Sequence, residues 1–131
     1  MKPTLLIIED NEQNLYLATY LLEQSGFKVA SARSGLDGIK LAGQIQPALI
    51  ILDIQLPEMD GYTVARALRQ NAALSAVPIV AVTSYAMMGD RERALEAGCN
   101  GYIEKPINPD TFRSQIEEHL NARPAGGGTQ S

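Results

Sequence analysis

The feature that most constrains the fold is a set of short apolar runs that contain no polar residue. Residues 5–8 read LLII and residues 48–52 read ALIIL, so apolar side chains would cover both faces of a strand formed there. A half-exposed strand alternates apolar and polar residues, whereas a strand buried on both faces is typical of a parallel sheet. Three further runs predict strands: residues 77–82, residues 101–103 and residues 27–32, the last of which includes Lys28 and Ser31. Pro78 lies near the start of one run, where a strand tolerates proline.

Helical patterns lie between these runs and predict helices over residues 12–25, 36–45, 62–69, 91–97 and 110–121. The last has the clearest signals, because Asn108 and Pro109 form a typical helix start and Phe112, Ile116 and Leu120 fall four residues apart. Strand and helix therefore alternate five times along the chain. This order predicts an α/β fold, with a doubly wound parallel sheet that carries helices on both faces.

Length and charge limit the function. The 131 residues fit one domain, which we expect to span residues 1–122, while residues 123–131 (RPAGGGTQS) predict a flexible tail or the stub of a linker. Acidic residues outnumber Lys and Arg by 15 to 11, so nucleic acid and anionic membranes are poor partners. A single cysteine, Cys99, and a single histidine, His119, are too few for a disulfide or a His-pair metal site. The early apolar run is too short for a signal peptide, which favours a cytoplasmic location.

Polar side chains stand at the ends of four of the five predicted strands. Since the carboxyl ends of parallel strands meet at one edge of a doubly wound sheet, we expect these side chains to converge there. Oxygen ligands suit Mg²⁺, and a carboxylate can accept a phosphoryl group as a nucleophile. Each residue alone also has an ordinary structural interpretation, as a helix cap or a turn residue, so only the joint placement is specific. The set is Glu9, Asp10, Asp53, Thr83, Ser84 and Lys105.

Four motifs in order make the chain resemble the receiver domains of two-component response regulators. They are LIIEDN at residues 6–11, LDIQLPEMDG at 52–61, PIVAVTS at 78–84 and GCNGYIEKP at 98–106. The resemblance covers about residues 4–121, nearly everything but the tail. Residues 81–106 further resemble stand-alone cell-cycle receivers of the DivK type and the receivers of hybrid kinases. The implied fold is flavodoxin-like, a five-stranded parallel sheet in the order 2-1-3-4-5 flanked by five helices.

The resemblance also implies roles for the residues of the site. Asp53 would accept the phosphoryl group, and Mg²⁺ would be held by Glu9, Asp10, Asp53 and the backbone carbonyl of Gln55. Glu9 stands where aspartate is commoner in the family, which puts the metal geometry rather than the assignment in question. Lys105 would contact the phosphoryl group. The remaining implied features are a cis peptide before Pro106, a switch formed by Thr83, Ser84 and Tyr102, and tuning of dephosphorylation by Gln55 and Tyr85.

The implied function is a phosphorylation-dependent signalling switch. A sensor histidine kinase or a histidine phosphotransfer protein would phosphorylate Asp53, and the fourth helix, fifth strand and fifth helix would present the state to a protein partner. The chain would catalyse only its own phosphorylation and dephosphorylation, as a monomer or a phosphorylation-dependent dimer. We expect no DNA-binding or enzymatic output domain after residue 122, and therefore protein contact or phosphoryl relay as the output. Alternatives are a degenerate receiver that docks without phosphorylation, an aspartyl-nucleophile phosphatase and a nucleotide or flavin module.

Two apolar surfaces are candidates for partner contact. Tyr16 and Tyr20 lie four residues apart on the first predicted helix, and packing against the last helix is the alternative. Met87 and Met88, which we expect to begin the fourth helix, offer flexible side chains typical of adaptable interfaces, and core filling is the alternative. Residues 90–93 (DRER) predict a solvated, ion-paired helix face, and His119 is expected at the surface.

Overall fold

The computed structural model describes residues 3–84 and 88–122 and confirms the predicted alternation of strands and helices. Residues 123–131, expected to form a tail, lie outside the described part. The elements in chain order are β1 (Thr4–Ile8), α1 (Glu12–Gln24), β2 (Lys28–Ala32), α2 (Gly35–Ile45), β3 (Leu49–Asp53), α3 (Gly61–Arg69), the 3₁₀ turn η1 (Ala72–Leu74), β4 (Ile79–Thr83), α4 (Asp90–Glu96), β5 (Gly101–Glu104) and α5 (Pro109–Ala122).

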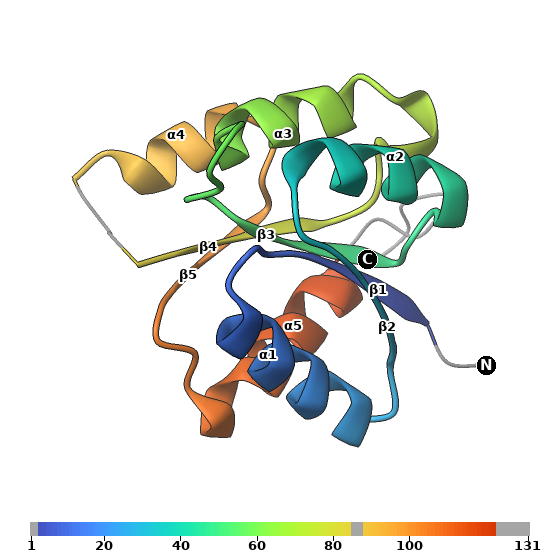
Figure 1. The fold of residues 1–131 in the computed structure, drawn as a ribbon, viewed down its shortest axis with the longest axis vertical. Helices are drawn as coiled ribbons and strands as arrows, with labels where there is room; N and C mark the ends of the chain where they lie inside the picture. Colours follow the sequence, from blue (N-terminus) through green and yellow to red (C-terminus); the bar gives the residue numbers. More distant parts are fainter. Residues whose placement is uncertain (1–2, 85–87, 123–131) are drawn as a thin grey trace.

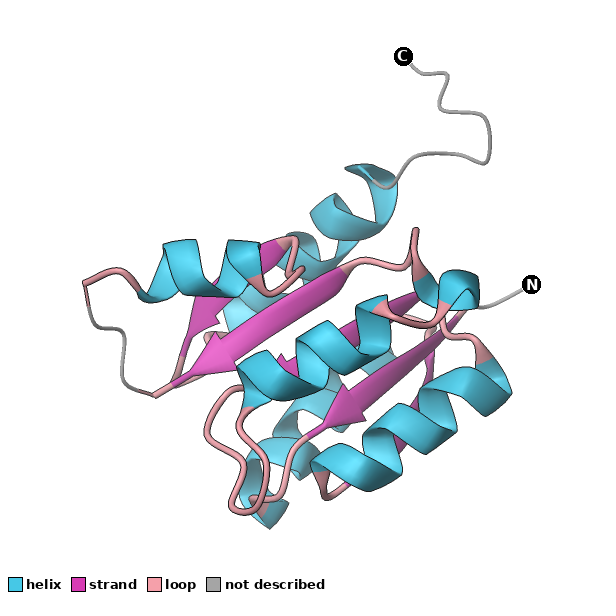
Figure 2. Cartoon of the chain, turned by 90° about the horizontal axis from the view of Figure 1, so that it is seen from above, coloured by secondary structure: helices cyan, strands magenta, loops and turns pink. Residues whose placement is uncertain are grey.

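The five strands form one parallel sheet in the order β2-β1-β3-β4-β5, as predicted. The registers align the strand ends: Ile8 pairs with Leu52, and Leu52 with Ala81. Helices α2, α3 and α4 cover one face of the sheet, and α1 and α5 cover the other (Figure 1). Figure 2, which views the molecule from above, shows helices lying over the sheet and running roughly along the strands. The chain therefore forms three layers, helix on sheet on helix.

Each face of the sheet has its own apolar core, which explains the uninterrupted apolar runs. Successive residues of a strand point to opposite faces, so Leu6 and Ile8 pack under α2 and α3 while Leu5 and Ile7 pack over α1 and α5. Strands β3 and β4 are buried at every position. The edge strand β2 is only partly buried, in keeping with its mixed sequence KVASA.

Polar caps start the helices where the sequence changes from strand to helix. The side chains of Asn11, Ser34 and Asp60 accept hydrogen bonds from backbone N–H groups in the first turns of α1, α2 and α3. Asn108 Oδ1 accepts from the Asp110 N–H, and Pro109 is the first residue of α5, as predicted. These caps fix where each helix leaves the sheet edge.

Arg69 ties three segments together at the far end of α3, a role the sequence did not reveal. Its guanidinium donates to Leu74 O at 2.8 Å, Gly98 O at 2.9 Å and Asn100 Oδ1 at 2.7 Å. Asn100 Oδ1 also accepts from the Ile79 N–H at 2.9 Å, at the start of β4. Burial lowers the pKa of Arg69, but the guanidinium stays charged because its ordinary pKa is far above neutrality.

Two expectations are wrong, one about the exposure of His119 and one about the start of the fourth helix. His119 is half-buried rather than a plain surface residue, since its ring lies over Gly101 of β5, where a Cβ atom would come within 2.3 Å of His119 Nε2. Met88 lies in a turn, and α4 begins only at Asp90. Among the described residues, no helix has both the length and the apolar character needed to span a membrane.

Candidate functional site at the carboxyl edge of the sheet

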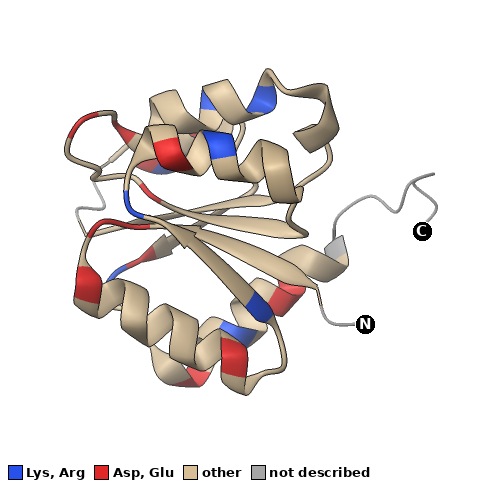
Figure 3. Cartoon of the chain, turned by 45° about the vertical axis from the view of Figure 1, so that its right-hand side comes forward, with Lys and Arg blue, Asp and Glu red and all other residues tan. Residues whose placement is uncertain are grey.

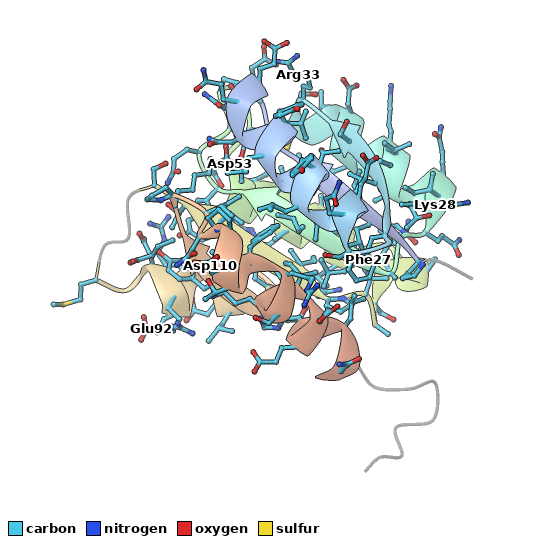
Figure 4. The ribbon with its side chains drawn as sticks, turned by 90° about the horizontal axis from the view of Figure 1, so that it is seen from below. Phe27, Lys28, Arg33, Asp53, Glu92 and Asp110 are labelled. Atoms are coloured by element: carbon cyan, nitrogen blue, oxygen red, sulfur yellow. The ribbon has the colours of Figure 1, made fainter. Side chains whose placement is uncertain are left out.

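The carboxyl ends of β1, β3, β4 and β5 bring the predicted polar residues to one edge. Glu9 and Asp10 follow β1, Asp53 ends β3, Thr83 ends β4, and Lys105 follows β5. Asp53 pairs with Val82 of β4, so the strand ends are level. Figure 4 labels Asp53 at the end of the molecule opposite Lys28, the first residue of β2, and Figure 3 shows acidic segments where the strands end. The convergence expected from the strand order is therefore present.

Three carboxylates at this edge are close enough to share one cation. Ligand oxygens of Glu9, Asp10 and Asp53 all lie within 4.8 Å of one another. Glu9 is 5% exposed and Asp53 3% exposed, whereas Asp10 is half-buried. Packed carboxylates repel each other, so a cation among them lowers their energy. A set of hard oxygen donors that leaves room for water suits Mg²⁺.

Lys105 supplies part of the missing positive charge. Its Nζ lies 3.0 Å from Glu9 Oε1 and 3.5 Å from Asp53 Oδ2, and the lysine side chain is itself buried. Burial is the largest cause that raises the pKa of Glu9 from 4.5 to about 7; the hydrogen bond from Lys105 lowers it, and the charge of Asp53 raises it. One ammonium group is thus insufficient for the buried acids, which again favours a divalent cation.

The loop after β3 fixes the Asp53 carboxylate. The Gln55 N–H donates to Asp53 Oδ1 at 3.0 Å, and the Gly61 N–H donates to Ile54 O at 2.9 Å. A Cβ atom at Gly61 would lie 2.5 Å from Ile54 Cα and 2.8 Å from Asp53 O, so only glycine lets α3 start this close to the strand end. Asp60 caps α3 beside it. The glycine of the PEMDG segment therefore positions the acidic site.

The side chain of Gln55 spans the gap between the ends of β3 and β4. Its Nε2 donates to Thr83 Oγ1, and its Oε1 accepts from the Ser84 N–H at 2.9 Å. The sequence resemblance gave Gln55 a carbonyl ligand role and a rate-tuning role, but not this bridge. No pattern in the sequence points to it, because the two ends are joined only by the pairing of β3 with β4.

Thr83 and Tyr102 share the face of the sheet covered by α3 and α4. Tyr102 pairs with Ala81 in register, and Ala81 lies two residues before Thr83, so both side chains point to the same side. Thr83 is buried and Tyr102 half-buried. The Tyr102 hydroxyl is buried without a hydrogen-bond partner among the described residues. Burial, more than the nearby charge of Asp90, raises the pKa of Tyr102.

The face expected to be solvated and ion-paired is present at residues 91–93, which are exposed, and Arg93 pairs with Asp90 at 3.7 Å. Asp90 departs from the expectation, because it is buried and accepts a hydrogen bond from the Tyr62 hydroxyl at 3.4 Å. The Arg93 guanidinium lies 4.5 Å from the centre of the Tyr62 ring, and that of Arg91 lies 5.6 Å from the centre of the Tyr102 ring. Two cation–π contacts thus attach α4 to α3 and β5.

The other predicted residues fall in several places. Tyr16 and Tyr20 are 73% and 51% exposed and stack with ring centroids 6.5 Å apart, so the alternative of packing against the last helix is wrong. Met88 is fully exposed and does not fill the core. The Lys105–Pro106 peptide bond is cis. Tyr85 and Met87 lie outside the described residues.

Comparisons with known proteins agree on one family. Residues 5–117 match the family model of the response regulator receiver domain. The chain is 42% identical over 120 residues to the polar-differentiation response regulator DivK of Brucella ovis. The aligned region covers 92% of this chain and 98% of the relative. DivK of Brucella anthropi shows the same identity and coverage.

Solved structures similar to this chain are also receiver domains and response regulators. The receiver domain of a sensor histidine kinase from Pseudomonas aeruginosa, solved with a magnesium ion in its active-site cleft, is 30% identical with a TM-score of 0.85 and covers 93% of this chain and 100% of its own. A putative response regulator from Chloroflexus aurantiacus is 28% identical with a TM-score of 0.87 over 92% of this chain and 99% of its own. Together with the four motifs and the sheet order, these matches show that the chain belongs to the response regulator receiver domain family of two-component signalling.

Proposed function

We propose that this receiver domain is a switch that accepts a phosphoryl group on Asp53 from a sensor histidine kinase or a histidine phosphotransfer protein. The observation that carries the proposal is the buried Asp53 carboxylate at the sheet edge, with Lys105 Nζ 3.5 Å away and the Glu9 and Asp10 oxygens within 4.8 Å. A carboxylate so placed is surrounded by the charges that phosphoryl transfer needs.

Each residue has a role in the proposed step. An Asp53 oxygen forms the new bond to phosphorus, the bond to the donor's imidazole nitrogen breaks, and that nitrogen keeps the electron pair and takes up a proton. Glu9, Asp10, Asp53 and the Gln55 carbonyl would hold Mg²⁺, which when bound neutralises charge on the phosphoryl oxygens. Lys105 would pair with one of these oxygens. Receiver domains typically bind Mg²⁺, and the donor set here fits it.

The output side of the proposal involves the end of β4 and the face formed by α4, β5 and α5. The Thr83 hydroxyl and the Ser84 N–H would contact the phosphoryl group, and Tyr102 would move inward as Thr83 moves. Gln55 and Tyr85 would set how fast water hydrolyses the acyl phosphate. A shift of this kind between two populated states is how a local charge reaches a distant surface.

The proposed partners are proteins. The stacked, exposed pair of Tyr16 and Tyr20 on α1 is a candidate contact for the phosphodonor, because α1 starts beside the acidic site. Met88, and with it Met87, is a candidate contact for a downstream protein. We propose residues 1–122 as the receiver with 123–131 as a tail or linker, a cytoplasmic location in keeping with the free thiol of Cys99, and a monomer or a phosphorylation-dependent dimer.

The decisive experiment is the intact mass after incubation with acetyl phosphate, with and without Mg²⁺. We expect one phosphoryl adduct that requires Mg²⁺ and is absent in Asp53→Asn, while Asp60→Asn, which changes a cap residue on the same loop, keeps the adduct. No adduct on a folded wild-type protein that binds Mg²⁺, with acetyl phosphate or a phosphorylated histidine donor, would contradict the proposal. It would favour a docking module that works without phosphorylation.

A further inference from the structure

The side-chain amide of Gln55 holds both polar groups at the end of β4. Its Oε1 accepts from the Ser84 N–H at 2.9 Å, and its Nε2 donates to Thr83 Oγ1. A backbone N–H can only donate, so the carbonyl side of the amide must face Ser84. This fixes the amide orientation and leaves the NH₂ group facing the Thr83 hydroxyl.

These two groups are the ones that the proposed function assigns to the phosphoryl oxygens. The Ser84 N–H has a single hydrogen, so a phosphoryl oxygen that takes this bond must displace Gln55 Oε1. A rotation of Thr83 toward Asp53 likewise carries Oγ1 away from Gln55 Nε2. The bonds seen here and the bonds of the phosphorylated form therefore compete for the same donor and the same hydroxyl.

Gln55 is also anchored to the acceptor itself. Its backbone N–H donates to Asp53 Oδ1 at 3.0 Å, while its side chain reaches β4 across the site. The residue is half-buried, so its side chain is ordered by these contacts rather than free in solvent. One residue thus joins the carboxylate that would be phosphorylated to the groups that would respond.

We propose that Gln55 is a positioning residue that holds Thr83 and Ser84 in the unphosphorylated arrangement and releases both when a phosphoryl group binds at Asp53. The inference rests on the proposed function. It differs from the rate-tuning role of Gln55, which concerns the access of water after phosphorylation, because this hold acts before phosphorylation. Gln55 opposes the active state and so lowers the affinity of the site for a phosphoryl group.

The size of the effect follows from the two hydrogen bonds. A net contribution typical of protein hydrogen bonds, taken twice, corresponds to a shift of about fivefold to a hundredfold in an equilibrium constant. Removing the amide should therefore tighten the binding of a phosphoryl mimic by about fivefold or more. A ligand that binds only the released state binds more tightly when release no longer requires these two hydrogen bonds to break.

The test compares wild type with Gln55→Leu and Gln55→Ala. Leucine keeps the bulk of glutamine without hydrogen bonds, and alanine removes both, so the pair separates hydrogen bonding from shielding. Gln44→Leu, an exposed glutamine of α2, is the matched control. Beryllofluoride with excess Mg²⁺ serves as the phosphoryl mimic, and nuclear magnetic resonance follows the Ser84 amide. Hydrogen exchange of that amide is measured in the protein without ligand.

Both Gln55 variants should exchange the Ser84 amide faster and bind beryllofluoride about fivefold or more tightly, while Gln44→Leu matches wild type. Unchanged exchange, or affinity that is equal or weaker in Gln55→Leu, overturns the inference. A gain in Gln55→Ala alone also overturns it, because size would then be the cause. If wild-type protein binds no beryllofluoride, the proposed function fails instead, and the exchange rates alone decide whether Gln55 holds Ser84.

Discussion

Replacing Glu9 by glutamine should stabilise the metal-free protein increasingly as the pH rises. Burial, with a contribution from Asp53 and against the effect of Lys105, raises the pKa of Glu9 from 4.5 to about 7. An acid with a higher pKa in the folded state binds its proton more tightly when folded, so the free energy of unfolding falls as the pH rises from about 4.5 to 7. Glutamine has nearly the same shape and does not titrate, so Glu9→Gln lacks this loss.

The magnitude follows from proton linkage. With pKa values of 4.5 in the unfolded chain and about 7 in the folded protein, Glu9 destabilises the metal-free fold by about 1 kcal/mol at pH 5 and about 3 kcal/mol at pH 8. The pKa of about 7 already includes the contact with Lys105 Nζ, which lies 3.0 Å from Glu9 Oε1, so the remaining difference between glutamine and protonated glutamate is the same at both pH values. Relative to wild type, the unfolding free energy of Glu9→Gln should therefore rise by about 2 kcal/mol between pH 5 and pH 8.

Urea unfolding in the presence of EDTA, followed by circular dichroism at several pH values, measures this difference. Glu12→Gln is the control, because it makes the same chemical change at an exposed position in the first turn of α1. A difference between Glu9→Gln and wild type that stays flat with pH would refute the reasoning. Saturating Mg²⁺ should reverse the order of stability, since a ligand that binds the native state stabilises it and the variant has lost one ligand.

Three further perturbations test other parts of the structure. Gly61→Ala should destabilise the protein by about 1–3 kcal/mol in urea unfolding and slow adduct formation, because its Cβ would press on the backbone of Ile54 and Asp53; unchanged stability would contradict the close contact. Arg69→Ala should lower the free energy of unfolding by about 2–4 kcal/mol in the same assay, because three hydrogen-bond acceptors lose their donor. A loss below about 1 kcal/mol would argue against a stabilising role for these three hydrogen bonds. Burial raises the pKa of Cys99 from 9.0 to about 11, which leaves about a hundredfold less thiolate at pH 8. Thiol labelling should therefore be at least about a hundredfold slower in native than in urea-unfolded protein. Equal labelling rates would refute the burial of Cys99.

The sequence was a good guide to the elements because their signals are local. The runs at residues 5–8 and 48–52 are apolar at every position, and both became strands buried on both faces. Asn108 and Pro109 predicted the start of α5 to within one residue. For the expected elements, errors lay at the ends, as at β4, which begins at Ile79 rather than at residue 77. The short turn η1 carries no periodic signal and was missed.

Predictions about single side chains were less successful where residues distant in the sequence determine whether a side chain is buried. The sequence predicted a solvated face over residues 90–93, which holds for residues 91–93, but Asp90 is buried and accepts a hydrogen bond from the Tyr62 hydroxyl. The sequence predicted His119 at the surface, but Gly101 leaves space for its ring on β5. In both cases the partner lies 18 or more residues away, so no local pattern could indicate the contact. The sequence likewise could not decide whether Tyr16 and Tyr20 pack against the last helix, and the structure shows that both are exposed.

The sequence by itself determined the order of strands and helices, the parallel character of the sheet and the residue types at the strand ends, because each depends on neighbours within a few residues of the chain. Only the tertiary structure decided how those strand ends interact. The contact of Lys105 with two buried acids, the raised pKa of Glu9 and the bridge from Gln55 to Thr83 and Ser84 all arise when β1, β3, β4 and β5 lie side by side. Charge and hydrogen bonding act through space, so their effects appear only once the sheet has brought distant residues within a few ångströms.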